Sequence, residues 1–343
     1  MSTQEIRAAG LDDDPRLARD YAACNTFLRR RNSAAYPAAR LLLAPDKRPH
    51  WDAILAFCTQ VDGLIDAPDR PVAARAAQYD AYVREFFALL TGENPWPHPP
   101  ETTQEAVGRR LARAFAHSVA TWNIPQDSVR LALKTIRTDM EVTEYPTFAD
   151  LAAYLDGLCG QAAKWGNALL MSGGRSTEEA DTKAAAASFG LQLTDCLRDL
   201  GEDLDDGRLY LPLEDLERFG LTRACVEEAA RARQMTPALR DLVRFEVDRA
   251  RRYFAEAADW WRLVDPAARE LPRQYVRLGQ FTLEQITRSG HDIFRTVPQA
   301  RVRCAVSSCA SFAMGYARAV STRSAGRLAP RRPLRVPASR LRL

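Results

Sequence analysis

The stretch DCLRDLGEDLDDGRLYLP, residues 195–212, decides the fold, because it concentrates six acidic residues in its first twelve positions. If the segment is helical, Asp195, Asp199 and Asp203 recur at i, i+4 and i+8 and share one face. Like charges at that spacing destabilise an isolated helix. The leucines between them predict that the other faces of the same helix pack against the protein. The repulsion therefore requires a compensating cation.

A second acidic pair lies far upstream, in AILAFCTQVDGLID, residues 53–66. Asp62 and Asp66 are four residues apart in an otherwise apolar helical pattern. Two helices that present aspartate pairs to a shared cavity suit Mg²⁺, which takes a few carboxylates, keeps waters and completes its shell with substrate phosphates. The alternative is that each segment is simply an acidic face exposed to water. Because two such segments occur, each within an apolar helical pattern, this alternative is the weaker interpretation. The predicted metal ligands and catalytic residues are Asp62, Asp66, Asp195, Asp199 and Asp203.

Cationic and polar residues near both segments predict that the ligand is a diphosphate. Arginine side chains, alongside Mg²⁺, neutralise a leaving diphosphate and so favour its ionisation. Some of these residues belong to the 195–212 stretch, and one precedes the upstream pair by about four helical turns. The predicted diphosphate-binding residues are Arg48, Gln192, Arg198, Arg208 and Tyr210.

The rest of the chain predicts an all-α protein. Apolar residues recur at i, i+3, i+4 and i+7 through most of the sequence, and no hairpin-type alternation appears. We expect about ten to thirteen helices in a single domain spanning residues 1–320. Residues 321–343 form a basic C-terminal tail, for which disorder is one expectation.

Composition limits the location and the partners of the protein. The chain has 343 residues and a formal net charge of +4, yet residues 295–343 carry eleven arginines and no acidic residue. The seven cysteines are scattered and form no C-x-x-C pair, which argues against structural zinc and favours a reducing, cytoplasmic location. We expect no transmembrane segment and no nucleic-acid partner, since no aromatic residue interleaves with the final arginines.

Three segments resemble the phytoene/squalene synthase family. QLTDCLRDLGEDLDDGRLYLP (192–212) resembles the family's second aspartate-rich motif, QxxNxxRDxxED followed by GRxYLP. QVDGLID (60–66) is similar to the first motif, and EYPTFADLAAYLDGLCG (144–160) to the segment that leads into Tyr-Val-Ala-Gly. The resemblance implies the isoprenoid-synthase helical bundle around a central cavity, an allylic diphosphate substrate and two or three Mg²⁺ ions.

The sequence departs from the family pattern at positions that serve head-to-head condensation in that family. Thr59 stands where the family usually has an arginine, Leu55 and Gly157 where it has tyrosines, and residues 32–36 (NSAAY) where it has His-Ser-x-Ser-Phe. Elsewhere, Gly63 replaces an aspartate of the first motif and Asp195 the asparagine of the second. We expect the loss of the tyrosine at position 157 to open space beside the donor site. The positions predicted to line the substrate pocket are Ser33, Tyr36, Leu55, Thr59, Gly157 and Cys159.

These departures favour an enzyme that ionises one allylic diphosphate, dimethylallyl or geranyl, and transfers the prenyl group to another acceptor. The family includes prenyltransferases of natural-product (secondary) metabolism that alkylate a carbazole ring, so we expect a carbazole-like aromatic acceptor. Tyr36, Tyr145 and Tyr154 are candidates for lining the pocket, although core packing explains each equally well. The sequence leaves the deprotonating base open, and the protein is expected to be a monomer or a homodimer.

Three alternatives stay open at this point. The first is a head-to-head phytoene or squalene synthase that condenses two prenyl diphosphates. The second is a cyclase or hydrolase acting on one prenyl diphosphate. The third is a non-enzymatic family scaffold, which would be expected to have lost its aspartates.

Overall fold

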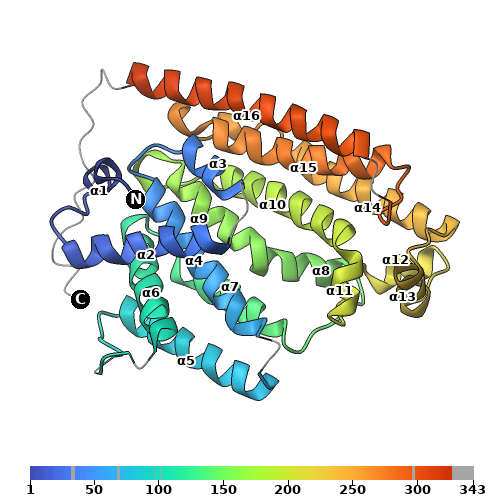
Figure 1. Cartoon of the computed structure of the whole chain (residues 1–343), viewed down its shortest axis with the longest axis horizontal. Helices are drawn as coiled ribbons and strands as arrows, with labels where there is room; N and C mark the ends of the chain where they lie inside the picture. Colours follow the sequence, from blue (N-terminus) through green and yellow to red (C-terminus); the bar gives the residue numbers. More distant parts are fainter. Residues whose placement is uncertain (32–34, 68–69, 97, 101, 296–297, 327–343) are drawn as a thin grey trace.

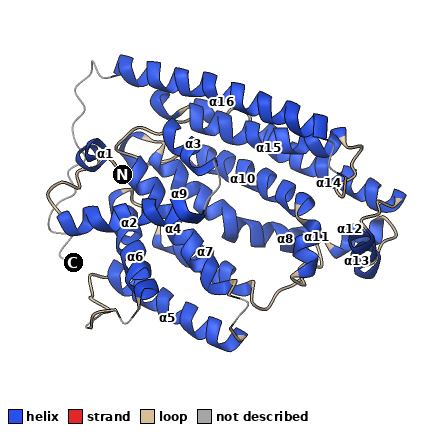
Figure 2. Ribbon diagram, in the orientation of Figure 1, coloured by secondary structure: helices blue, strands red, loops and turns tan. Residues whose placement is uncertain are grey.

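The protein is built almost entirely of helices that stack roughly side by side (Figures 1 and 2). The computed structural model describes residues 1–31, 35–67, 70–96, 98–100, 102–295 and 298–326. Across these ranges the chain forms no β-strand, and one isolated parallel bridge joins Glu144 to Leu209. The predicted all-α class is confirmed.

The first half of the chain forms two groups of packed helices. In chain order, the α-helices of residues 1–169 are α1 (Thr3–Ala8), α2 (Pro15–Arg31), α3 (Ala35–Leu42), α4 (Arg48–Ile65), α5 (Val72–Leu90), α6 (Thr103–Thr121), α7 (Gln126–Thr138), α8 (Phe148–Leu155) and α9 (Gln161–Leu169). A π-helical turn, Asp156–Gly160, joins α8 to α9.

The second half contains the longest helices. Its α-helices are α10 (Glu178–Arg198), α11 (Leu200–Asp205), α12 (Leu213–Arg218), α13 (Arg223–Ala232), α14 (Pro237–Glu256), α15 (Glu270–Arg288) and α16 (Pro298–Gly326). Short 3₁₀ turns occur at Ser172–Gly174, Trp260–Arg262 and Pro266–Ala268.

The described residues thus contain sixteen α-helices, more than the ten to thirteen expected. The excess comes from six-residue helices such as α1, α11 and α12, which are too short to show a full amphipathic period. α16 continues through Gly326, past residue 320 where the tail was expected to begin, and residues 327–343 lie outside the described part. None of the helices in the described ranges is long and apolar enough to cross a membrane.

Helix α10 lies inside the bundle, between α9 on one side and α14 and α15 on the other. The largest hydrophobic cluster forms around it and includes Leu193 and Leu197, as the leucine pattern predicts. The ring of Phe254, on α14, fills space beside two glycines: a Cβ on Gly190 of α10 or on Gly279 of α15 would overlap it. These close approaches hold the three helices together.

A second cluster packs α4 against α5, α6, α7 and α9, and a third packs α4 against the N-terminal helices. Trp51 on α4 contacts all three clusters. Helix α4 is therefore held along its whole length. Its last turn carries Asp62, so the first acidic pair has a rigid support.

Candidate active site

The first acidic pair lies at the C-terminal end of α4. Asp62 is in the last turn, and Asp66 is the capping residue, whose backbone N–H donates to the Asp62 carbonyl at 3.0 Å. Leu55 and Thr59 precede Asp62 at helical spacing on the same side of α4. This spacing agrees with their predicted place beside the pair, and their contact with substrate stays a prediction.

The second acidic series crosses the break between α10 and α11. Asp199 ends α10 with a backbone conformation of φ −98° and ψ 8°, and α11 begins at the next residue. The hydrogen-bond pattern nevertheless continues, because Asp199 N–H donates to the Asp195 carbonyl at 2.8 Å and Asp203 N–H to the Asp199 carbonyl at 2.9 Å. The predicted i, i+4, i+8 alignment is thus kept across the kink.

Arg208 connects the two acidic series. Its backbone N–H donates to the Asp203 carbonyl at 2.8 Å, which holds it against α11. Its guanidinium reaches the first pair, with Nη2 lying 3.0 Å from Asp66 Oδ1. Segments 142 positions apart in the chain therefore meet at one arginine. This contact is the direct evidence that both motifs face a common site.

Arg198 neutralises the other side of the site. Its Nε and Nη2 donate to the two oxygens of Asp199 at 2.7 and 2.5 Å. Its Nη1 also lies 2.7 Å from Asp195 Oδ1, but this oxygen is buried without a hydrogen bond, so the contact is an ion pair outside hydrogen-bonding geometry. Arg198 therefore lies between Asp195 and Asp199 and offsets the negative charge of both.

Asp139 belongs to this site, and the sequence analysis missed it. It caps the end of α7, and its Oδ2 accepts a hydrogen bond from the Tyr154 hydroxyl at 3.1 Å. Burial raises its pKa to about 7; Tyr154 and Arg208 oppose the shift, whereas Asp62 and Asp66 add to it. These interactions add α7 to the helices α4, α10 and α11 at the site. The segment TDME around Asp139 offers no repeat or spacing that links it to either motif.

An aromatic cluster lies next to Asp139. The rings of Tyr145, Tyr154 and Tyr210 are mutually close, with centroid separations of 5.1, 5.9 and 6.1 Å. Tyr145 and Tyr154 are buried and Tyr210 is half-buried. The faces of such rings attract a cation. Tyr210, which the sequence predicts to bind the diphosphate, therefore also belongs to an aromatic cluster that can stabilise positive charge.

The carboxylates of the site hold their protons more strongly than ordinary aspartates. Burial raises the pKa values of Asp62, Asp195 and Asp203 to about 6, and the neighbouring carboxylates Asp66 and Asp199 add to the effect. Asp62 is nevertheless exposed to solvent, where a ligand can reach it. Excess negative charge in an accessible place attracts a divalent cation.

The donor set fits Mg²⁺, which takes one or two carboxylates and completes its shell with water and substrate phosphates. Among the residues described, no three acidic, histidine or cysteine side chains converge as a ready-made metal cage. An arrangement of separate carboxylate pairs therefore suits ions that bridge the protein to a diphosphate. Asp62 and Asp66 would hold such ions on α4, and Asp195, Asp199 and Asp203 on α10 and α11.

Arg48 is not part of this site, contrary to the sequence prediction. It begins α4, and fourteen residues of helix place it about 20 Å from Asp62. Its guanidinium instead lies 3.1 Å from Glu5 Oε1 and donates to the Leu43 carbonyl at 3.0 Å. The spacing of about four helical turns between Arg48 and Asp62 is correct, but four turns of helix separate the two side chains in space.

Tyr36 also belongs to that distant region. Its hydroxyl donates to Asp52 Oδ1 at 2.6 Å and accepts from Asn25 Nδ2 at 2.9 Å. The side chain is buried in this polar network, and its contact with substrate stays a prediction. Ser33 lies outside the described residues.

Gly157 does not open space, which corrects a second expectation. It lies in the π-helical turn, and a Cβ built on it would overlap the Thr135 side chain of α7. The volume that a tyrosine would need is filled by that neighbouring helix. Cys159, two residues on, is half-buried, and its thiol donates to the Leu155 carbonyl at 3.2 Å. Gln192 is half-buried on α10, three residues before Asp195 and on the same side.

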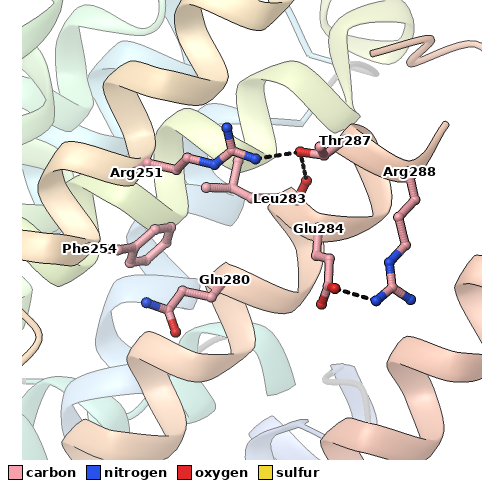
Figure 3. A pocket seen from close by; sticks show the side chains of 7 residues that line it. All are labelled: Arg251, Phe254, Gln280, Leu283, Glu284, Thr287 and Arg288. Atoms are coloured by element: carbon pink, nitrogen blue, oxygen red, sulfur yellow. Dashed lines mark hydrogen bonds and ion pairs between the residues drawn. The ribbon is translucent and has the colours of Figure 1, made fainter. Parts of the chain in front are cut away.

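A separate groove of about 510 Å³ runs over the surface between α14 and α15 (Figure 3). Four of its polar side chains are already paired: Arg251 donates to Thr287 Oγ1 at 2.7 Å, and Arg288 donates to Glu284. None of the aspartates of the two motifs lines it. The groove is therefore distinct from the candidate active site.

Comparisons with known proteins agree with this site. Residues 29–307 match the model of the squalene/phytoene synthase family. The chain is 27% identical over 263 residues to the 15-cis-phytoene synthase of Synechocystis sp. (strain ATCC 27184 / PCC 6803 / Kazusa), which covers 74% of this chain and 73% of that protein. It is 26% identical over 307 residues to the 15-cis-phytoene synthase of Synechococcus elongatus, covering 84% of this chain and 92% of that protein.

Solved structures show the same fold. The squalene synthase HpnC from Alicyclobacillus acidocaldarius superposes with a TM-score of 0.67 and 28% identity, over 80% of this chain and 95% of that one. A dehydrosqualene synthase in complex with a ligand superposes with a TM-score of 0.69 and 21% identity, over 86% of this chain and 96% of that one. The predicted isoprenoid-synthase bundle is confirmed.

Proposed function

Because the chain belongs to the squalene/phytoene synthase family, we propose that it condenses two prenyl diphosphates head to head into a hydrocarbon of thirty or forty carbons. The observation that carries the proposal is the link between the acidic series: Asp66 and Asp203, from separate helices, are joined through Arg208. Two acidic series face one site, the first with Asp62 and Asp66 and the second with Asp195, Asp199 and Asp203, which would provide for two diphosphates.

The finding at Gly157 weakens the interpretation as an aromatic prenyltransferase. That interpretation relied on a cavity enlarged by the loss of a tyrosine, and Thr135 fills the space. The named relatives are phytoene, squalene and dehydrosqualene synthases. The carbazole-like acceptor therefore has no support from either source, and the head-to-head alternative is preferred.

Members of the family typically use Mg²⁺, which when bound would neutralise a diphosphate and make it a better leaving group. The number of ions, two or three, stays a prediction. Arg198 and Arg208 add fixed positive charge on two sides of the same site. In this structure they compensate the aspartates, and we expect them to turn toward the phosphate oxygens when substrate arrives.

The reaction needs a place where a carbocation is stabilised and water is kept away. The C1–O bond of one substrate breaks, and the diphosphate leaves with the bonding electrons. The double bond of the second substrate supplies the electron pair for the new carbon–carbon bond. Loss of the second diphosphate and, in all, of two protons from carbon completes the charge balance and gives a neutral hydrocarbon without a reductant. The cluster of Tyr145, Tyr154 and Tyr210 offers ring faces to the cation beside the acidic residues.

A product assay tests the proposal. The purified protein is incubated with Mg²⁺ and geranyl, farnesyl or geranylgeranyl diphosphate, with and without a hydroxylated carbazole or an indole panel. Extracts are analysed by gas chromatography and mass spectrometry. We expect a hydrocarbon of twice the donor length without any acceptor. Asp199→Asn should abolish it, whereas Asp241→Asn, which removes an exposed carboxylate on α14, should not.

Other products would identify the other functions. A prenylated ring formed from a short donor would restore the aromatic prenyltransferase and overturn the proposal. A cyclised or hydrolysed single chain would identify a cyclase or a hydrolase. Tight diphosphate binding with no turnover of any donor would point to a non-enzymatic scaffold.

A further inference from the structure

Arg31, the last residue of α2, lies beside the first acidic motif. A Cβ built on Gly63, which follows Asp62 in the last turn of α4, would be 3.5 Å from Arg31 Nη1. That is an ordinary van der Waals distance, so the guanidinium lies directly alongside Gly63. Arg31 belongs to neither acidic motif and has no helical spacing to them, so the sequence alone offers no signal for it.

The packing of α2 against α4 brings Arg31 to this place. The Tyr21 hydroxyl lies 3.0 Å from Nδ1 of His50, near the start of α4. Asn25, one turn further along α2, donates to Asp52 at 3.1 Å. The contacts advance along both helices in the same direction, so the C-terminal end of α2 lies toward the acidic end of α4.

The Arg31 side chain is held in position but has no carboxylate partner in the described part of the chain. Its Cζ lies 4.4 Å from the centroid of the Phe27 ring, one turn earlier on α2, in a cation–π contact. Arg31 is exposed and forms no hydrogen bond or ion pair within the described ranges. Arg198 and Arg208, by contrast, are each paired with an aspartate of the site. The Arg31 donors are therefore available to a ligand.

Helix α4 carries no positive charge near its acidic end. Residues 49–66 contain no lysine and no arginine, and Thr59 stands where the family usually has an arginine. Thr59 and Gly63 are four residues apart and share a face of α4, and Arg31 lies next to that face. An aspartate at position 63 would put a carboxylate beside the guanidinium. Gly63 therefore leaves Arg31 without that partner.

We propose that Arg31 binds the substrate diphosphate at the first acidic motif and supplies the positive charge that α4 lacks there. The inference rests on the proposed function and assigns one further residue to its substrate. A guanidinium donates paired hydrogen bonds to phosphate oxygens in a fixed geometry, in addition to its charge. The contact with Phe27 restricts the side chain before the ligand arrives, which lowers the entropy cost of binding.

Isothermal titration calorimetry of the full-length protein with inorganic diphosphate and Mg²⁺ tests the proposal. Arg31→Gln should weaken binding about ten- to a hundredfold, because a charge-assisted contact to phosphate is lost. The matched control is Arg30→Gln, which removes the same charge from the adjacent exposed residue of α2. It should change the affinity less than about twofold, because successive side chains on a helix point about 100° apart. Both variants should unfold at the wild-type urea concentration.

A second substitution tests where the charge is needed. In the chain with Arg31→Gln, Thr59→Arg puts a guanidinium back on the same face of α4, one turn before Gly63. We expect this double variant to recover at least about fivefold in diphosphate affinity. Recovery would show that the site needs a cation on this face, whichever helix supplies it.

Three results would overturn the proposal. Equal affinities of wild type and Arg31→Gln would show that the guanidinium only covers Phe27. Equal losses in Arg31→Gln and Arg30→Gln would mean a general effect of charge at the end of α2. No recovery in the double variant would place the lost contact away from the face of α4 that carries Thr59 and Gly63. The titration needs no turnover, so Arg31 can bind diphosphate in a protein that forms no hydrocarbon, and the proposed function and this inference fail separately.

Discussion

Asp52 and Asp62 lie on the same helix, α4, yet they have opposite surroundings. Asp52 is fully buried, and its carboxylate accepts hydrogen bonds from Arg40 Nε at 3.0 Å, Tyr36 at 2.6 Å and Asn25 at 3.1 Å. The side chain of Asp62 has no hydrogen bond or ion pair to any residue that the structure describes. The first carboxylate is part of the scaffold, and the second is left available to a ligand.

The pKa values at the two ends of α4 express the same difference. Burial opposes ionisation of Glu5, but hydrogen bonds from Arg40, from the Ser2 backbone and from Arg48 outweigh it and lower its pKa to about 2. At the other end, burial and the charge of Asp66 raise the pKa of Asp62 to about 6. An acidic side chain in a helix therefore indicates a site only when the fold withholds its partners.

The largest expected effect tests the acidic site, where we expect the carboxylates to serve a ligand. Asp199→Asn should lower the rate of hydrocarbon formation by about a thousandfold or more, since it removes a charge that organises the leaving diphosphate. Because the ion pair of Asp199 with Arg198 is largely exposed, we expect the free energy of unfolding to fall by about 1 kcal/mol or less. Steady-state kinetics and urea denaturation of the same preparation measure both. A loss of stability that accounts for the loss of activity would contradict the distinction between structural carboxylates such as Asp52 and the ligand-binding carboxylates of the acidic site.

The next prediction tests the buried network around Asp52. Asp52→Ala should lower the free energy of unfolding by about 3–5 kcal/mol, because it leaves the buried Arg40 without this partner. Urea denaturation gives the value. Asp80→Ala is the control, since Asp80 forms a more exposed pair with Arg137 and should cost about 1 kcal/mol or less. Equal costs would show that the buried network contributes no more than a surface pair.

Arg208→Ala should weaken catalysis without removing a metal ligand. The loss of one charge-assisted contact to the diphosphate predicts a decrease in kcat/KM of about ten- to a hundredfold. If Arg208 only joins the two motifs mechanically, Arg208→Lys, which keeps the charge, should behave like the alanine variant. Recovery of activity in the lysine variant supports a role of the charge on the substrate.

The raised pKa of Asp139, at the acidic site, predicts that stability depends on pH. Its pKa is raised to about 7 in the folded protein, so its contribution to stability is full below about pH 4 and is lost as the pH rises through 7. Asp139→Asn removes that loss. We expect the variant to gain about 1–2 kcal/mol relative to wild type between pH 5 and 8, after allowance for solvent screening. Denaturation curves across that range, which would superpose if Asp139 is unperturbed, provide the test.

The smallest effect concerns Arg48, which the sequence assigned to the diphosphate. Arg48→Ala should leave KM for the prenyl diphosphate unchanged and cost about 1 kcal/mol of stability through its lost contact with Glu5. The paired comparison is with Arg208→Ala, whose kinetics should change. A raised KM in Arg48→Ala would return this residue to the site.

The sequence predicted the fold and the acidic motifs because both depend on local repeats. The spacing of Asp195, Asp199 and Asp203 survived even the break between α10 and α11, since the backbone hydrogen bonds continue through it. The motif that supplies these aspartates also supplies Arg208, so the link between the two halves of the site was encoded in one segment.

What the sequence could not predict depends on contacts between distant segments. Asp139 has no periodic relation to either motif and is placed by the docking of α7. Tyr36 and Arg48 lie close in sequence to residues of interest but turn toward Asp52 and Glu5. Gly157 suggested an open cavity, and only the packing of α7 shows that Thr135 occupies it. A small residue therefore predicts space only when its neighbours are known.

The ring of Phe254, which occupies the room that side chains at Gly190 and Gly279 would need, has an evolutionary consequence. Residues 190, 254 and 279 are therefore expected to be substituted together. A larger residue at either glycine is tolerated only when residue 254 becomes smaller in the same lineage. Across related chains the side-chain volumes at these positions should vary in opposite directions, and redesign of the bundle around α10 must change all three together.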